Sequence, residues 1–142
     1  MSTASKEVVR TLFEAVNAGD LETILSLIGD EMVVHTSVPG IGPGRDGFRA
    51  FMQVFFDAFP EQHTDVHALI ADGDLVAAHH THHATNLGSF AGMPPTGRQV
   101  HVDGIELFRI NDGKIVEMWH HDDLLSLMQQ LGAIPGPDGV AG

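Results

Sequence analysis

Histidines and carboxylates gather at two places in the sequence, and both kinds of side chain can transfer protons or bind metal ions. Segment 79–83 has the sequence HHTHH, which puts four imidazoles into five positions, and segment 120–123 has the sequence HHDD. An imidazole titrates near neutral pH, and a carboxylate beside it can hold it in the orientation that proton transfer needs. The two segments are therefore the first candidates for an acid–base site or a metal site.

The histidines of segment 79–83 divide between two faces if this segment is a β-strand. His79, Thr81 and His83 would then share one face, and His80 and His82 the other, because the side chains of a strand alternate. We predict that His79 and His83 line a pocket, while His80 and His82 face solvent or a dimer partner.

A metal site would need three or four converging ligands. His79 and His83 could supply two of them, and His35, His120 or Glu106 could complete the set. The sequence contains no recognised metal-binding spacing such as H-E-x-x-H. We therefore expect no bound metal and no cofactor.

Segment 98–122 has the pattern of a β-hairpin, and the register of its two strands decides which side chains meet. A three-residue loop with Gly113 in a left-handed conformation suits the turn I-N-D-G-K and would place Ile110 opposite Lys114. One face of the hairpin would then carry Gly104, Glu106, Phe108, Val116, Met118 and His120. A carboxylate and an imidazole among apolar neighbours can have the shifted pKa values that acid–base catalysis needs. A buried Glu–His pair that only stabilises the sheet fits the same pattern.

Two carboxylates, Asp122 and Asp123, end the second strand of this hairpin. Asp123 is placed to cap the helix that follows, which is a structural role. Either carboxylate could instead orient His120 or His121, as a base and its orienting partner require. The candidate catalytic residues are His120, Asp122, Asp123 and Glu106.

Three amphipathic helices are predicted in the first 60 residues, with a β-like stretch, EMVVHTS (31–37), between the second and the third. Apolar residues recur at helical spacing up to Gly19, after which Asp20 can cap a second short helix over 21–29. A third helix begins near Arg45 or Asp46, and Pro60 stops it. Its apolar stripe consists of Phe48, Phe51, Met52, Phe55 and Phe59.

Strand patterns fill the second half of the chain, with a hairpin turn at Asp72-Gly73 and a terminal helix over 124–132. Helices that come first and antiparallel strands that follow indicate the α+β class. We expect a curved, mostly antiparallel sheet wrapped on three helices, in the shape of a cone, with a central pocket between the sheet and the long helix.

Composition and charge limit the possible partners. The 142 residues suit one domain over 1–133 with a flexible tail over 134–142. A net charge of −12 disfavours binding to nucleic acid or to an anionic membrane. The sequence has no cysteine, no signal-peptide core at its N-terminus and no apolar run of about 18 residues. We expect a cytoplasmic protein.

Several runs resemble one known family. GMPPTGR (92–98), GIELFRINDGKIVEMW (104–119) and DLLSLMQQLG (123–132) resemble the SnoaL-like polyketide cyclases, also called ester cyclases, of the nuclear transport factor two-like superfamily. GPGRDGFRAFMQVFFDAFP (42–60) fits the long helix of that family, and the resemblance covers about residues 5–132.

The resemblance implies an α+β cone around an apolar pocket, and commonly a homodimer. It also implies that a ring of a polyketide ester closes by intramolecular aldol chemistry, with an acidic side chain as general acid/base and neither metal nor cofactor. The catalytic aspartate of the cyclases falls on His120, and their pocket-lining Gln and His fall on Gly104 and Glu106, so none of the three residue types is retained. His35 matches a position where the wider family often has a pocket histidine.

Together these features favour a cofactor-independent enzyme, a cyclase-like lyase or isomerase that acts on a hydrophobic carbonyl compound. His120 would be the main acid/base, oriented by Asp122 or Asp123. The expected substrate-binding residues are His35, His79, His83, Phe51, Phe55, Phe108, Met118 and Met93.

Two alternatives remain open. One is a limonene-epoxide-hydrolase-like enzyme, whose Asp–Arg–Asp arrangement could use only Arg98 or Arg109 here. The other is a non-catalytic, dimeric module that binds a small ligand, because a fold alone does not define a function.

Overall fold

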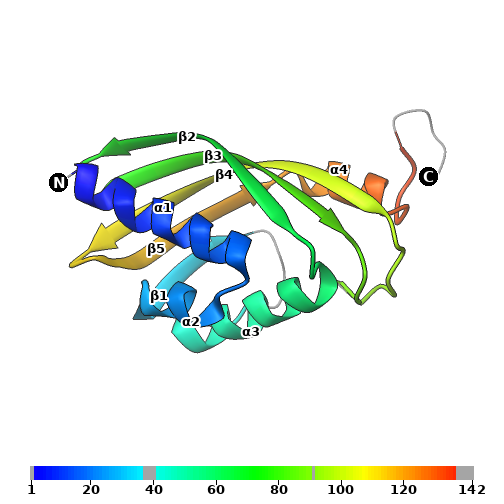
Figure 1. Cartoon of the computed structure of the whole chain (residues 1–142), viewed down its shortest axis with the longest axis horizontal. Coiled ribbons are helices and arrows are strands. Elements are labelled where there is room, and N and C mark those ends of the chain that lie inside the picture. Colours follow the sequence, from blue (N-terminus) through cyan, green and yellow to red (C-terminus); the bar gives the residue numbers. More distant parts are fainter. Residues whose placement is uncertain (1, 37–40, 91, 137–142) are drawn as a thin grey trace.

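The computed structural model describes residues 2–36, 41–90 and 92–136, which form one curved sheet and four helices (Figure 1). Helices α1, α2 and α3 lie on the concave side of the sheet, and α4 lies near its far end (Figure 1). The expected α+β cone is confirmed. In chain order the elements are α1 (Ser2–Ala18), α2 (Leu21–Ser26), β1 (Ile28–Thr36), α3 (Gly44–Ala58), β2 (His63–Asp72), β3 (Leu75–Thr85), β4 (Gln99–Asn111), β5 (Lys114–Asp122) and α4 (Leu124–Gln130).

The strands follow the order β1-β5-β4-β3-β2 across the sheet. All neighbouring pairs are antiparallel except β1 and β5, which run parallel. The sheet is thus mostly antiparallel, as expected, and strands β3, β4 and β5 form its centre. Each of these three strands is hydrogen-bonded to a neighbouring strand on either side, which fixes the positions of its side chains.

The hairpin of β4 and β5 turns more tightly than the sequence analysis predicted. Asp112 and Gly113 both have positive φ, 51° and 73°, and Asn111 lies opposite Lys114. Positive φ at both central residues is the requirement of a two-residue type I′ turn, for which Asp-Gly is a preferred pair. The predicted three-residue loop was therefore wrong.

The register beyond this turn differs from the predicted one by two residues. A shift in the pairing between Arg109 and Ile110 brings Glu106 opposite His120 and Phe108 opposite Met118. A displacement of two residues leaves every side chain on its expected face, because the side-chain period of a strand is two. The shared inward face therefore survived the error in register, and the corrected pairing puts Glu106 and His120 side by side.

The inward face of the sheet and the apolar faces of the helices form the core. Phe108, Val76 and Ile115 are fully buried from the sheet, and Val9 is fully buried from α1. A second group of buried apolar residues joins the C-terminal part of α3 to β4 and α4. The two groups flank the space between the sheet and α3.

The outer face of the sheet is exposed in the single chain. Ile105 is 55% exposed and Ile70 is 68% exposed, and several histidines lie among them. In the described part of the chain, no helix is both long enough and apolar enough to cross a membrane. Of the tail predicted to be flexible, residues 137–142 lie outside the described residues.

Candidate active site

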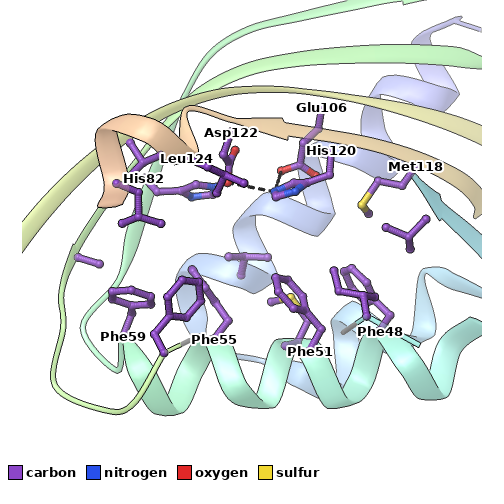
Figure 2. Close-up of a pocket in the computed structure, with 18 of the residues that line it drawn as sticks. Phe48, Phe51, Phe55, Phe59, His82, Glu106, Met118, His120, Asp122 and Leu124 are labelled. Atoms are coloured by element: carbon purple, nitrogen blue, oxygen red, sulfur yellow. Dashed lines mark ion pairs between the residues drawn. The ribbon is translucent and has the colours of Figure 1, made fainter. Parts of the chain in front are cut away.

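A cavity lies between the sheet and α3, with an apolar floor and a polar patch on its opposite wall. Phe48, Phe51 and Phe55 of α3 and Phe59, which follows the helix directly, lie on one side and face His82, Glu106, His120 and Asp122 on the other (Figure 2). The other residues that line it are Leu12, Phe13, Val16, Val34, Ile41, Met52, Ala84, Phe90, Val100, Val102, Met118, Leu124 and Leu127. An apolar pocket with a few convergent polar groups is the usual form of a small-molecule site.

His120 is held by contacts on both ring nitrogens. Its Nε2 lies 3.1 Å from Oδ2 of Asp122, and its Nδ1 lies 3.2 Å from the hydroxyl of Thr36 on the neighbouring strand β1. Burial alone would lower the pKa of His120, but the charge of Glu106 and the ion pair with Asp122 outweigh it and raise this pKa to about 9. His120 is therefore a cation at neutral pH.

The two carboxylates of the cluster stay ionised although both are buried. Burial would raise the pKa of Glu106, but His120, at 3.9 Å, and His80, at 3.0 Å, hold this pKa below its usual value. Burial would likewise raise the pKa of Asp122, and its pairing with His120 lowers the pKa instead. One imidazolium thus sits between two carboxylates in an apolar surrounding.

His82 has the opposite tendency to His120. Its Nδ1 lies 2.6 Å from the hydroxyl of Thr64, and its Nε2 lies 3.8 Å from Oδ2 of Asp122. Burial lowers the pKa of His82, and the charge of Asp122 offsets this only in part. The site therefore contains one charged imidazole and one neutral imidazole. Groups whose pKa values are pushed apart are typical of acid–base sites.

Gly104 makes room for the cluster. A Cβ atom at this position would lie 2.1 Å from Oδ1 of Asp122 and 2.8 Å from Cε1 of His80. Such distances are well inside van der Waals contact, so any other residue would displace one of the two side chains. The Asp122 carboxylate and the His80 ring both occupy the space that this glycine leaves free.

Six of the predicted site residues lie at the cavity. They are the catalytic candidates Glu106, His120 and Asp122 and the substrate-binding candidates Phe51, Phe55 and Met118. The prediction for Phe108 was right about its face but not about its surroundings, because it is fully buried in the core and is not among the lining residues. Met93 packs against the second core group rather than lining the cavity.

Four other predicted site residues point elsewhere. Asp123 is exposed, and its carboxylate caps α4 by accepting a hydrogen bond from the backbone N–H of Ser126 at 3.0 Å, so its role is structural. His35 stacks on Trp119 outside the cavity and lies 2.8 Å from Glu117. His79 and His83 lie on the outer face of the sheet. His79 packs against the ring of His67, and His83 pairs with Asp65 and His101.

The two faces of segment 79–83 are therefore the opposite of those predicted, because His80 and His82 face inward and His79 and His83 face outward. β3 pairs with β4 so that His80 lies opposite Gly104 and His82 opposite Val102, both on the inward face. His80 is fully buried, and His82 lines the cavity. Within the segment nothing distinguishes the two faces. The signal that could have found them is the pairing with β4, whose inward face was identified correctly.

His80, His82, Glu106 and Asp122 also form a set of possible metal ligands. One ligand atom from each lies within 4.8 Å of the others. Two imidazoles and two carboxylates are a donor set that divalent transition metals accept. The ligands that the sequence analysis considered, His79, His83 and His35, are not among them.

Comparisons with known proteins identify the fold and the family. The fold is the nuclear transport factor two-like cone of cyclases. Solved structures that match it include AclR from Streptomyces galilaeus, with a TM-score of 0.85 at 28% identity over 96% of this chain and 85% of that chain. IdmH from Streptomyces antibioticus matches with a TM-score of 0.77 at 34% identity over 90% of this chain and 98% of that chain.

The family follows from the sequence matches. The family model described as SnoaL-like polyketide cyclase matches residues 6–131. Aklanonic acid methyl ester cyclase DnrD of Streptomyces peucetius is 30% identical over 138 residues, which is 94% of this chain and 94% of that protein. The chain belongs to the SnoaL-like polyketide cyclase family.

Proposed function

We propose that the chain is a cofactor-independent cyclase that closes a ring in a hydrophobic, polyketide-like carbonyl compound by an intramolecular aldol addition. The observation that supports this most is the ion pair of His120 and Asp122 on the wall of an apolar cavity. An aldol addition needs a base for a C–H proton and an acid for the new alkoxide. A carboxylate and an imidazolium in contact supply both.

In the proposed first step, Asp122 takes a proton from a carbon flanked by carbonyl groups. The C–H electron pair becomes an enolate, which is delocalised over the substrate carbonyls. Because the pKa of Asp122 is lowered, its carboxylate is deprotonated at neutral pH and can accept the proton. The cationic His120 stabilises the negative charge that develops on oxygen.

In the second step, the enolate carbon attacks a carbonyl carbon of the same molecule. A C–C bond forms, the carbonyl π bond opens, and the alkoxide takes a proton from His120. The proton on Asp122 then returns to Nε2 of His120 through the 3.1 Å contact. The substrate is neither oxidised nor reduced overall, and Asp122 and His120 account for both proton transfers, so these steps call on no redox cofactor. In a substrate without a second carbonyl group within reach, the enolate would instead be reprotonated at another carbon, which would isomerise the substrate.

The apolar floor suggests the substrate class. Phenylalanines from α3 face the polar patch, so a flat hydrophobic compound could lie between them with its carbonyl groups toward the sheet (Figure 2). The methyl ester of aklanonic acid, named in the description of DnrD, is the first compound to test.

The hydrolase alternative has little support in the described residues. Its Asp–Arg–Asp arrangement needs an arginine in the cavity, and neither candidate lines it. Arg109 pairs with Asp74 and Glu117, and Arg98 lies beside Gly132, near the end of α4.

Incubation with aklanonic acid methyl ester in the presence of a chelator, followed by chromatography, tests the proposal. We expect ring closure with the wild-type chain and a loss of at least about 100-fold in kcat for His120→Gln and Asp122→Asn. Asp123→Asn is the matched control, because it changes the next carboxylate, which lies outside the cavity, and asparagine caps helices as well as aspartate.

A simple 1,3-dicarbonyl compound in D2O separates the alternatives. Enzyme-dependent deuterium exchange without ring closure would support proton abstraction but another final step. Absence of both turnover and exchange would contradict catalysis and favour a ligand-binding module. Conversion of a small epoxide to a diol would favour the hydrolase.

We further propose that the chain forms a homodimer through the outer face of the sheet. Ile105 and Ile70 leave apolar surface exposed there. Light scattering of the wild-type chain and of an Ile105→Glu variant tests this, and a monomeric wild-type chain would contradict it.

A further inference from the structure

We propose that His80, His82, Glu106 and Asp122 form a binding site for one divalent transition-metal ion. Their ligand atoms lie within 4.8 Å of one another, and the residues come from the paired strands β3, β4 and β5. Figure 2 shows His82, Glu106 and Asp122 gathered on one wall of the cavity. The inference is independent of the proposed function.

Buried polar atoms without hydrogen-bond partners point to a missing ligand. Among the described residues, Nδ1 of His80 and Oδ1 of Asp122 have no such partner. His80 is 0% exposed, and its Nε2 is only in ion-pair contact with Glu106, at 3.0 Å. Buried polar groups are normally satisfied, so two orphan atoms in one cluster need an explanation. A metal ion would satisfy the orphan nitrogen of His80 that it binds.

The donor set and the spacing suit such an ion. Two neutral imidazoles and two carboxylates carry a formal charge of −2, which a dication neutralises. Tetrahedral coordination with bonds of about 2.0–2.1 Å separates ligand atoms by roughly 3.3–3.5 Å. The ligand atoms, now within 4.8 Å of one another, would therefore need to move closer by up to about 1.5 Å, which side-chain rotations can supply.

Gly104 leaves space for two of the proposed ligands, His80 and Asp122. The absence of a Cβ atom lets the His80 ring and the Asp122 carboxylate approach the backbone of β4 and each other. Thr64, beside Nδ1 of His82, fixes this ring so that its Nε2 faces the cluster. Partners that fix the orientation of a ligand ring are typical of metal sites.

Bound metal would compete with the acid–base chemistry. Coordination by Oδ2 of Asp122 would engage the oxygen that contacts His120. Binding by His82 and Glu106 would also engage two side chains that line the cavity. We therefore expect metal to inhibit ring closure in proportion to occupancy.

Titration of the chelator-treated chain with Co²⁺ and Zn²⁺ tests the site, by visible absorption for Co²⁺ and by calorimetry for both. We expect one ion per chain with a Kd of about 1 μM or tighter, and a Co²⁺ spectrum of the intense, low-coordinate type. His82→Gln and Asp122→Asn should each weaken binding by more than the roughly 10–100-fold that loss of a supporting partner costs. His82→Gln is the most informative variant, because His82 lines the cavity and its replacement should disturb folding less than replacement of the fully buried His80.

The outer histidines provide the matched control. His83→Gln with His101→Gln removes two exposed imidazoles that lie 2.7 Å apart and should leave the affinity within about 2-fold. Loss of binding in this control, unchanged binding in His82→Gln, or a Kd above about 1 mM would overturn the proposal. Circular dichroism of each variant identifies misfolding.

Turnover of aklanonic acid methyl ester with chelator distinguishes this inference from the proposed function. Turnover in chelator without metal binding would overturn the metal site alone. Metal binding without turnover under any condition would support the site and contradict the cyclase. Turnover that requires added metal would support the site and overturn the inhibition described above.

Discussion

Replacement of Gly104 by alanine tests how the glycine positions the proposed catalytic pair. The new methyl group would lie 2.1 Å from Oδ1 of Asp122, whereas real Cβ contacts are essentially never shorter than 3.0 Å, so the carboxylate must move by about 0.9 Å. Oδ2 of the same carboxylate lies 3.1 Å from Nε2 of His120. If the carboxylate moves away from His120 by that amount, this contact lengthens to about 4.0 Å, which is beyond hydrogen-bond distance. We expect kcat for aklanonic acid methyl ester to fall about 100-fold, as misplacement by about 1 Å can cost.

The stability of this variant must be measured with its activity. Packing strain from an added methyl group costs about 1–3 kcal/mol, and urea unfolding followed by circular dichroism would measure it. Asp123→Asn is the control, because it changes an exposed residue outside the cavity and preserves the cap of α4. A folded Gly104→Ala variant with wild-type kcat would refute the idea that this close approach positions Asp122 for catalysis.

Four further predictions follow from the site and its surroundings. In chelator, the free energy of unfolding should fall by about 1–3 kcal/mol as pH rises from 7 to 10. The reason is that the pKa of His120 is about 9 in the folded chain and about 6.5 in the unfolded chain, so the stabilisation from its charge is complete below pH 6.5 and lost above pH 9. A urea-unfolding profile without this fall, or the same fall in Asp122→Asn, would contradict the prediction. Asp123→Ala should cost about 1 kcal/mol in unfolding experiments through loss of a helix cap, with kcat unchanged. His79→Gln should leave turnover within 2-fold, and a larger loss would show that the outer face takes part in the reaction. Phe55→Ala should raise KM about 10-fold or more through lost apolar contact, which steady-state kinetics would detect.

Local patterns were sufficient to predict most of the fold. The apolar stripe around Phe51 and Phe55, the Asp20 cap and the Asp72-Gly73 turn depend on residues close in sequence, and each was found where expected. The hairpin register was wrong by two residues because the tight turn and the pairing shift both depend on detail that composition does not reveal.

The site was harder to predict because it depends on pairing between distant strands. Glu106 and His120 share a face within one hairpin, so their period of two was informative. The inward face of β3 is set by its pairing with β4, and the run of alanines and histidines before Thr85 has no contrast between its faces. His35 was assigned to the pocket for a similar reason. The adjacent Val33 and Val34 do not show which face of β1 is buried, and in the structure Val33 faces outward and is 50% exposed.

The parallel pairing of β1 with β5 has a consequence for the order in which the molecule assembles. Thr36 and His120 are 84 residues apart in the sequence, yet their side chains meet at 3.2 Å. Closure of so long a loop is entropically costly, and non-local pairing slows folding. The hairpins β2–β3 and β4–β5 can form from neighbouring residues first, so β1 joins the sheet late. We expect the ring of His120 to gain its Thr36 contact in one of the last steps of folding, so that a refolding chain recovers its secondary structure before its activity.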